Sequence, residues 1–138
     1  MPDFVTTHRI THEASRKMLD AGIAKANALG APVSLAVVDA SGKLLAFLQM
    51  DGARFFSGRA TIKKAVTAAS QRLATGYFPR EGEVSMQIRM DGEFTNVPGG
   101  LPIVVEGQVV GGVGAGGAKV EQDVEIAKAA LAALGLPD

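Results

Sequence analysis

The segment from Val97 to Gly117 decides the fold, and it reads Val-Pro-Gly-Gly-Leu-Pro-Ile-Val-Val-Glu-Gly-Gln-Val-Val-Gly-Gly-Val-Gly-Ala-Gly-Gly. Two β-branched runs, Ile103–Val105 and Val109–Val110, flank Glu106-Gly107-Gln108. This arrangement predicts a tight β-hairpin, because glycine supplies the positive φ that a short turn needs. The preceding Pro98–Pro102 segment is expected to be neither helix nor central strand, because its two prolines lack donors and its two glycines weaken any regular element.

Glycines alternate with small residues from Gly111 to Gly117, directly after the hairpin. Glycine within a strand indicates a close approach to the backbone, either by a packed helix or by a flat ligand, and both interpretations stay open. Gly112–Gly117 also matches the pattern G-x-G-x-x-G. A dinucleotide site would need a βαβ unit and a later strand with an acidic residue. Because the pattern follows a hairpin and no such strand is expected, we reject a nucleotide site.

Periodicity away from this segment predicts further helices and strands. A helix is expected to begin at the N-cap Thr11 and to end at Gly30. A second helix is expected after the possible cap Ser57, ending at Gly76 and Pro79. The remaining expected elements are strands at Ser34–Val38 and Leu44–Met50, one short helix within Arg80–Met90, and a C-terminal helix over Val120–Leu134. The order α-β-β-α-(α)-β-β-α predicts a single α+β domain over residues 1–138, an antiparallel sheet of hairpins flanked by helices.

Composition excludes several classes of protein. The chain has 138 residues, 14 basic and 14 acidic side chains and no cysteine. A balanced charge gives no field that favours nucleic acid or an anionic membrane. The lack of cysteine excludes disulfides, thiolate metal sites and a cysteine nucleophile. We expect a cytoplasmic chain with neither a nucleic-acid nor a membrane partner, and we expect no metal site, since the Thr11 cap leaves His8 outside the helix that His12 begins.

Several short segments, in this order and spacing, resemble one family. They are Thr11–Ala26, the Val37-Val38-Asp39-x-x-Gly42 turn, Met50-Asp51-Gly52-Ala53, Lys64-Ala65-x-Thr67-Ala68, Pro98-Gly99-Gly100-x-Pro102-Ile103, and Gly111-Gly112-Val113-Gly114 with Glu121-Gln122-Asp123. The chain is similar to the GlcG/HbpS-like proteins, known as haem-degrading or haem-binding domains, which include the C-terminal domain of PduO-type proteins. The resemblance implies a profilin-like α+β fold, homo-oligomers and, in some members, bound haem b. It differs in the segment between Gly76 and Met90.

Two groups of residues are candidates for ligand binding. Arg54 and Phe55 suit a flat anionic ligand, because arginine pairs with a carboxylate while an aromatic ring covers the ligand face. The second group lies along the central loop and the glycine-rich strand, where backbone N–H groups and short polar side chains can meet carboxylates. Its members are Phe94, Thr95, Asn96, Gly99, Gly100, Gly112 and Gly114. On this hypothesis, Gly100→Val is expected to fold and to lose ligand binding.

His12 is the candidate axial ligand if haem binds, since neutral imidazole ligates haem iron. The alternative is a solvated histidine at a helix terminus. Asp123 and its acidic neighbours are expected to complement the helix dipole, and Asp123 is also expected to brace the Gly114–Gly117 turn. No catalytic residue is legible in the sequence.

The favoured hypothesis is a homo-oligomeric protein that binds a small molecule, with haem b or another flat carboxylate-bearing ligand in a pocket between Arg54, the Phe94–Leu101 loop and the glycine-rich strand. One alternative is an enzyme that acts on a small organic acid, with Arg54 as anchor and His12 or an acidic residue transferring a proton. A second alternative is an oligomeric scaffold in which the glycines serve packing alone.

Overall fold

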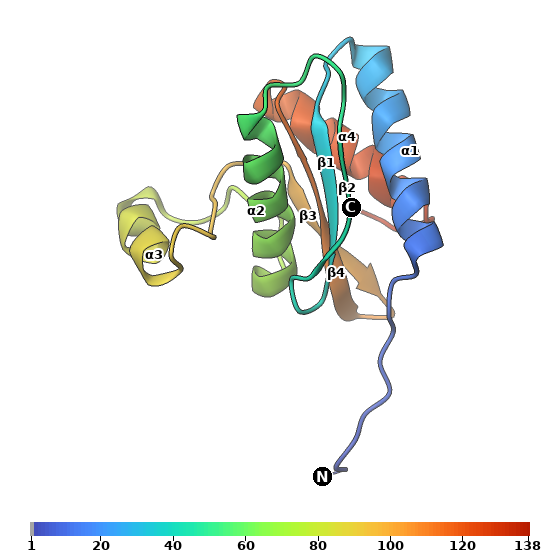
Figure 1. Ribbon diagram of the computed structural model, residues 1–138. Helices are drawn as coiled ribbons and strands as arrows, with labels where there is room; N and C mark the ends of the chain where they lie inside the picture. Colours follow the sequence, from blue (N-terminus) through green and yellow to red (C-terminus); the bar gives the residue numbers. More distant parts are fainter. Residues whose placement is uncertain (1) are drawn as a thin grey trace.

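A four-stranded antiparallel sheet organises the computed structural model, which describes residues 2–138. The strand order is β2-β1-β4-β3 (Figure 1). The central strands are β1 (Ser34–Asp39) and β4 (Gln108–Gly116), and the edge strands are β2 (Leu44–Gln49) and β3 (Gly100–Val105). The predicted hairpin is β3–β4, whose turn places Glu106 and Gly107 at φ 50° and 78°. Pro102 is tolerated in β3 because an edge strand does not need every N–H donor.

Helices cover both faces of this sheet. On one face lie α1 (His12–Leu29) and α4 (Val120–Ala132), and on the other lies α2 (Phe56–Gln71) (Figure 1). A 3-10 turn, Arg80–Gly82, leads into the short helix α3 (Glu83–Arg89), which projects beyond α2. The predicted α+β class and element order are therefore confirmed.

β1 is buried at five of its six positions because both of its faces are covered. Leu35 and Val37 pack in the larger core with α1 and α4, whereas Ala36 and Val38 pack in a smaller cluster with Ala65 of α2. The alternation follows from the two-residue period of a strand. The larger residues thus face two helices, and the small side chains let α2 approach the sheet.

The alternating glycines of β4 lie directly beneath α2. A Cβ on Gly112 would stand 2.2 Å from the carbonyl oxygen of Ala65, and one on Gly114 would stand 2.5 Å from that of Thr61. Real Cβ atoms do not approach a carbonyl oxygen so closely, so only glycine lets the helix backbone rest on the strand. Of the two open interpretations of this segment, the packed helix accounts for these glycines.

Gly100 also lies under α2, and the expectation for Gly100→Val needs correction. Its φ lies outside the left-handed region, and a Cβ would stand 2.2 Å from the carbonyl oxygen of Lys64. A valine would therefore push against α2 instead of intruding on a ligand. Gly99 does have a positive φ of 127°, and its missing Cβ leaves room for the Lys64 ammonium group.

The ends of α1 are as predicted, whereas those of α2 are not. Thr11 caps α1 by accepting a hydrogen bond from Ala14 N, and Gly30 ends it in the left-handed conformation. In α2 the N-cap is Phe55, without a side-chain cap, and Ser57 instead donates to the carbonyl of Arg54. The helix ends at Gln71, before the predicted Gly76 and Pro79. Arg72 takes the left-handed position with φ 62°, which sequence patterns assign to glycine.

Candidate functional site

The four glycines predicted to bind ligand lie inside the packed structure. Gly99, Gly100, Gly112 and Gly114 are buried between β3, β4 and α2, and the atoms that face their missing Cβ positions belong to the protein itself. The space expected for a ligand between the central loop and the glycine-rich strand is occupied by α2. These glycines act by positioning that helix.

Arg54 and Phe55 lie at the exposed start of α2. The Arg54 guanidinium donates to the carbonyl of Gly117 at 3.4 Å, across to the end of β4. Phe55 is 70% exposed, and its ring lies 4.5 Å from the ring of Phe56. The cation that faces an aromatic ring here is Arg59, 5.8 Å above Phe56. This contact involves neither Arg54 nor Phe55, whose predicted role in ligand binding stays a prediction.

Phe94, Thr95 and Asn96 tie the projecting segment to α2. Phe94 is buried and meets the ring of Phe78 edge to face at 5.1 Å. Thr95 N donates to the Thr67 hydroxyl at 3.1 Å. The Asn96 side chain accepts from Phe78 N and donates to Phe78 O and to the Glu83 carboxylate. The amide of Asn96 is thus fully used inside the protein.

A groove runs along the outer face of α2, between this helix and the segment from Gln87 to Thr95. It consists of three hollows of about 160, 370 and 230 Å³. They adjoin one another, since Phe94, Arg59 and Val66 each line two of them. We call this the α2 groove, and its lining residues are Phe56, Arg59, Ala60, Ile62, Lys63, Val66, Thr67, Ser70, Gln71, Gln87, Met90, Gly92, Glu93, Phe94 and Thr95.

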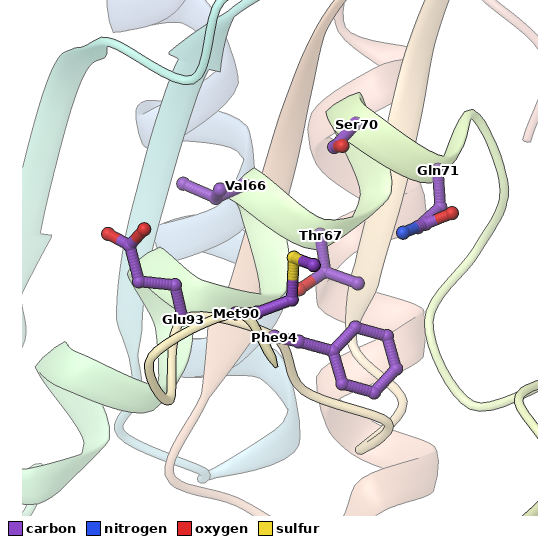
Figure 2. A pocket seen from close by; sticks show the side chains of 7 residues that line it. All are labelled: Val66, Thr67, Ser70, Gln71, Met90, Glu93 and Phe94. Atoms are coloured by element: carbon purple, nitrogen blue, oxygen red, sulfur yellow. The ribbon is translucent and has the colours of Figure 1, made fainter. Parts of the chain in front are cut away.

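The smallest hollow is mainly apolar and contains a thioether. Figure 2 shows Met90 and Phe94 beside Thr67 of α2, with Val66 and Glu93 toward one end. Of the residues predicted from the sequence, only Phe94 and Thr95 line the α2 groove.

The α2 groove carries two cations without acidic partners. Arg59 and Lys63 are four residues apart on α2, so they lie on one side of the helix about 6 Å apart at Cβ. Within residues 2–138 neither forms an ion pair or a side-chain hydrogen bond. Glu93 lines the hollow of about 230 Å³ together with both cations and adds one negative charge there. The sequence signal for this site was the Arg59/Lys63 spacing on the polar side of a helix, and it was missed.

A buried ion pair lies on the opposite, inner side of α2. Lys64 Nζ contacts Asp123 at 3.0 Å, and both side chains are 3% exposed. Lys64 also donates to the carbonyl of Ala115 at 3.0 Å, and Asp123 accepts from Ala118 N at 3.1 Å. Burial raises the pKa of the Asp123 carboxyl, while the charge and hydrogen bond of Lys64 oppose that rise. This pair connects α2, β4 and α4, and Asp123 holds the backbone N–H of Ala118, one residue beyond the Gly114–Gly117 turn that it was predicted to brace.

His12 lies apart from the α2 groove. It is exposed at the start of α1, on the other side of the sheet from α2 (Figure 1). His8 contacts Glu106 at 3.3 Å and Gln108 at 3.5 Å, beside the β3–β4 turn.

Within the described residues, no three His, Asp or Glu side chains are grouped as metal ligands. Nor does any helix of residues 2–138 have the length and apolar character to cross a membrane.

Known proteins resemble this chain in both sequence and structure. Residues 10–132 match the family model described as "Haem degrading protein HbpS-like". An uncharacterized 15.0 kDa protein from the dhaT-dhaS intergenic region of Citrobacter freundii is 35% identical over 127 residues, which cover 88% of this chain and 89% of that protein. The crystal structure of the Klebsiella pneumoniae protein ORFY superposes with a TM-score of 0.91 at 29% identity, covering 100% of this chain and 99% of that one. The structure described as a PduOC:heme complex matches with a TM-score of 0.81 at 28% identity, over 91% of this chain and 95% of that one.

Proposed function

Because the chain belongs to the HbpS-like family, we propose that it binds a flat, carboxylate-bearing small molecule in the α2 groove, with haem b as the first candidate. One observation carries the proposal: two cations without acidic partners, Arg59 and Lys63, border a hollow lined by aromatic and aliphatic side chains. Guanidinium and ammonium groups bind carboxylates, and the apolar lining suits the face of a flat ring system.

The groove has the volume of a small-molecule site and a lining whose chemistry suits haem b. Its largest hollow, about 370 Å³, falls within the range of roughly 300–1,000 Å³ that is usual for small-molecule sites. Haem b carries two carboxylates on one edge of a flat apolar ring, which corresponds to Arg59 and Lys63 beside Phe94. When bound, haem supplies an iron centre that accepts axial nitrogen or sulfur ligands. Met90 offers a thioether sulfur in the groove.

The PduOC:heme complex supports haem as the first ligand to test, since this chain matches 95% of that structure's chain. His12 stays a prediction for the axial ligand and now has a competitor. A haem bound in the α2 groove would lie near Met90, whereas His12 begins α1 on the other side of the sheet. Soret spectra of His12→Ala, His8→Ala and Met90→Ala distinguish the two positions, because loss of the axial ligand shifts the absorption maximum.

The direct test is titration with hemin, followed by Soret absorption. Arg59→Gln combined with Lys63→Gln should weaken hemin binding about tenfold, equivalent to about 1.4 kcal/mol, since two carboxylate contacts are lost. The matched control is Arg16→Gln with Lys17→Gln, which removes the same charge from exposed positions on α1. Its affinity should equal that of the parent.

Equal weakening in both double variants would mean that only net charge matters, and the α2 groove would be the wrong site. A parallel titration with a small dicarboxylate tests the breadth of the ligand class. Binding of the dicarboxylate without any binding of hemin would retain the cationic site and reject haem.

A further inference from the structure

The N-terminal arm, residues 2–7, is an apolar segment that its own chain leaves uncovered. Phe4 is 90% exposed and Val5 is 81% exposed. The arm forms neither helix nor strand and extends away from the body of the molecule (Figure 1). It is anchored where Ile10 enters the core and where His8 contacts Glu106. Neighbouring exposed aromatic and aliphatic side chains on a protruding segment indicate a docking element.

The α2 groove has the complementary chemistry. The arm carries Asp3 directly before Phe4, so one anionic and one aromatic group follow each other. The groove presents the cations Arg59 and Lys63 beside apolar walls that include Phe94. A charged group stands beside apolar side chains in both the arm and the groove, with charges of opposite sign. This complementarity would set both the position and the orientation of an arm bound in the groove.

The lengths also agree. Six extended residues span at most about 20–22 Å. The 16 residues of α2 extend over about 24 Å, so the arm can lie along most of the groove. The arm of the same chain is poorly placed for this contact, because it starts on the α1 side of the sheet (Figure 1). It would have to pass the sheet and a helix about 10–12 Å thick before reaching the outer face of α2.

We propose that the N-terminal arm of one copy of this chain binds in the α2 groove of a second copy, with Asp3 at Arg59 and Lys63 and Phe4 among the apolar lining. The arm then adds a segment to its partner, and two copies related by a twofold axis exchange arms. As far as it concerns the ligand, the inference rests on the proposed function: arm and carboxylate ligand exclude each other, because both use the same cations.

Engineered disulfides test the contact, since the natural chain has no cysteine. Chains with Phe4→Cys and a tag are mixed with untagged Met90→Cys chains under mild oxidation. The mixed disulfide should form at least about tenfold more than with a Val120→Cys partner, whose cysteine replaces a similarly exposed residue on α4. Equal yields with both partners, or no mixed product, would overturn the proposal.

Charge exchange gives an independent readout. Asp3→Lys should reduce the Phe4–Met90 cross-link severalfold, and combining it with Arg59→Glu and Lys63→Glu in the partner chain should restore the yield. Failure of the exchanged pair to recover, in partner chains that fold normally by circular dichroism, contradicts the proposed orientation.

Hemin separates this inference from the proposed function. Saturating hemin should lower the Phe4–Met90 cross-link severalfold if both occupy the α2 groove. An unchanged yield in the presence of bound hemin would overturn the competition and place the haem elsewhere, whereas the specific cross-link itself would still support arm docking.

Discussion

Lys64 differs from a typical lysine because its side chain is buried, at 3% exposed. Its inner-face position on α2 buries an ammonium group that has Asp123 and the carbonyl of Ala115 as acceptors. Burial of a charge is tolerated when hydrogen bonds and an opposite charge replace water. The glycines beside it make this possible, because a Cβ on Gly99 would stand 2.9 Å from Lys64 Nζ.

Lys64→Met should destabilise the protein by about 3–5 kcal/mol at neutral pH, because it leaves Asp123 buried without its cation. Chemical denaturation measures the loss. A matched control is Lys25→Met, which breaks the exposed pair Lys25–Glu125 at 3.8 Å and should cost less than about 1 kcal/mol. Similar losses in both variants would mean that burial gives the Lys64–Asp123 pair no special weight.

For Lys64→Met we also predict that the loss of stability depends on pH. An aspartate whose folded-state pKa is raised adds stability below its ordinary pKa of 3.8, and this contribution is lost as the pH rises through the folded-state pKa. Lys64 opposes the rise, so Lys64→Met raises the folded-state pKa of Asp123 further. The stability difference between parent and variant should therefore grow as the pH rises from acidic to neutral. A difference that stays constant over this range contradicts the role of the Asp123 charge.

Glu93 adds a negative charge to a groove that we propose for carboxylates. Glu93→Gln removes that repulsion and should tighten the binding of hemin about twofold to fivefold, in line with the energy of an exposed charge pair. Glu81→Gln, an exposed change in the 3-10 turn, is the control and should leave the affinity unchanged. Weaker binding in Glu93→Gln would place the carboxylates of the ligand away from this hollow.

At the scale of elements, the close contact of α2 with β4 sets the positions of everything outside it. Gly112→Ala should destabilise the fold by about 1–3 kcal/mol, because its Cβ would meet the backbone oxygen of Ala65 and not a flexible side chain. Gly82→Ala is the comparison, since its Cβ would meet only the ring edge of Phe78 at 3.0 Å. Thermal unfolding of both variants measures the difference, and a fully stable Gly112→Ala variant would contradict the role of glycine as a spacer.

The segment that contains α3 is held by the hydrogen bonds of Asn96 and by the Phe78–Phe94 contact, since neither the 3-10 turn nor α3 contains a buried residue. Asn96→Ala removes three hydrogen bonds to Phe78 and Glu83 and should speed amide exchange in residues 77–95 about tenfold or more. Exchange in β4 should stay unchanged. Asn27→Ala on the exposed side of α1 is the control. Unchanged exchange in residues 77–95 would show that the Phe78–Phe94 contact alone holds the segment.

At the scale of the molecule, apolar side chains remain exposed at several separate places. Phe55, Val84 and Ile88 are 70–73% exposed, in addition to Phe4 on the arm. We expect the chain to associate, so light scattering at micromolar concentration should give a mass that is a multiple of 14.2 kDa. Association should persist at about 0.5 M salt, where exposed charge pairs are screened. A species of only 14.2 kDa would contradict this prediction.

The sequence by itself determined the elements. Thr11 and Gly30 marked α1, the Glu106-Gly107 turn marked the β3–β4 hairpin, and alternation of helices with hairpins predicted the antiparallel sheet. These signals are local, because capping, turn geometry and apolar periodicity act over a few neighbouring residues. The family resemblance followed from the same short segments and was confirmed over residues 10–132.

Only the tertiary structure decided what approaches each element. From the sequence, the glycines of β4 could face either a bound ligand or a packed helix. The position of α2 in the structure shows that they face the helix. Lys64 and Asp123 are 59 residues apart in sequence, and no local pattern pairs them. Arg59 and Lys63 form a groove wall only because the distant segment ending at Phe94 packs beside α2. Contacts between remote segments depend on how whole elements pack, and the preferences of single residues do not contain that information.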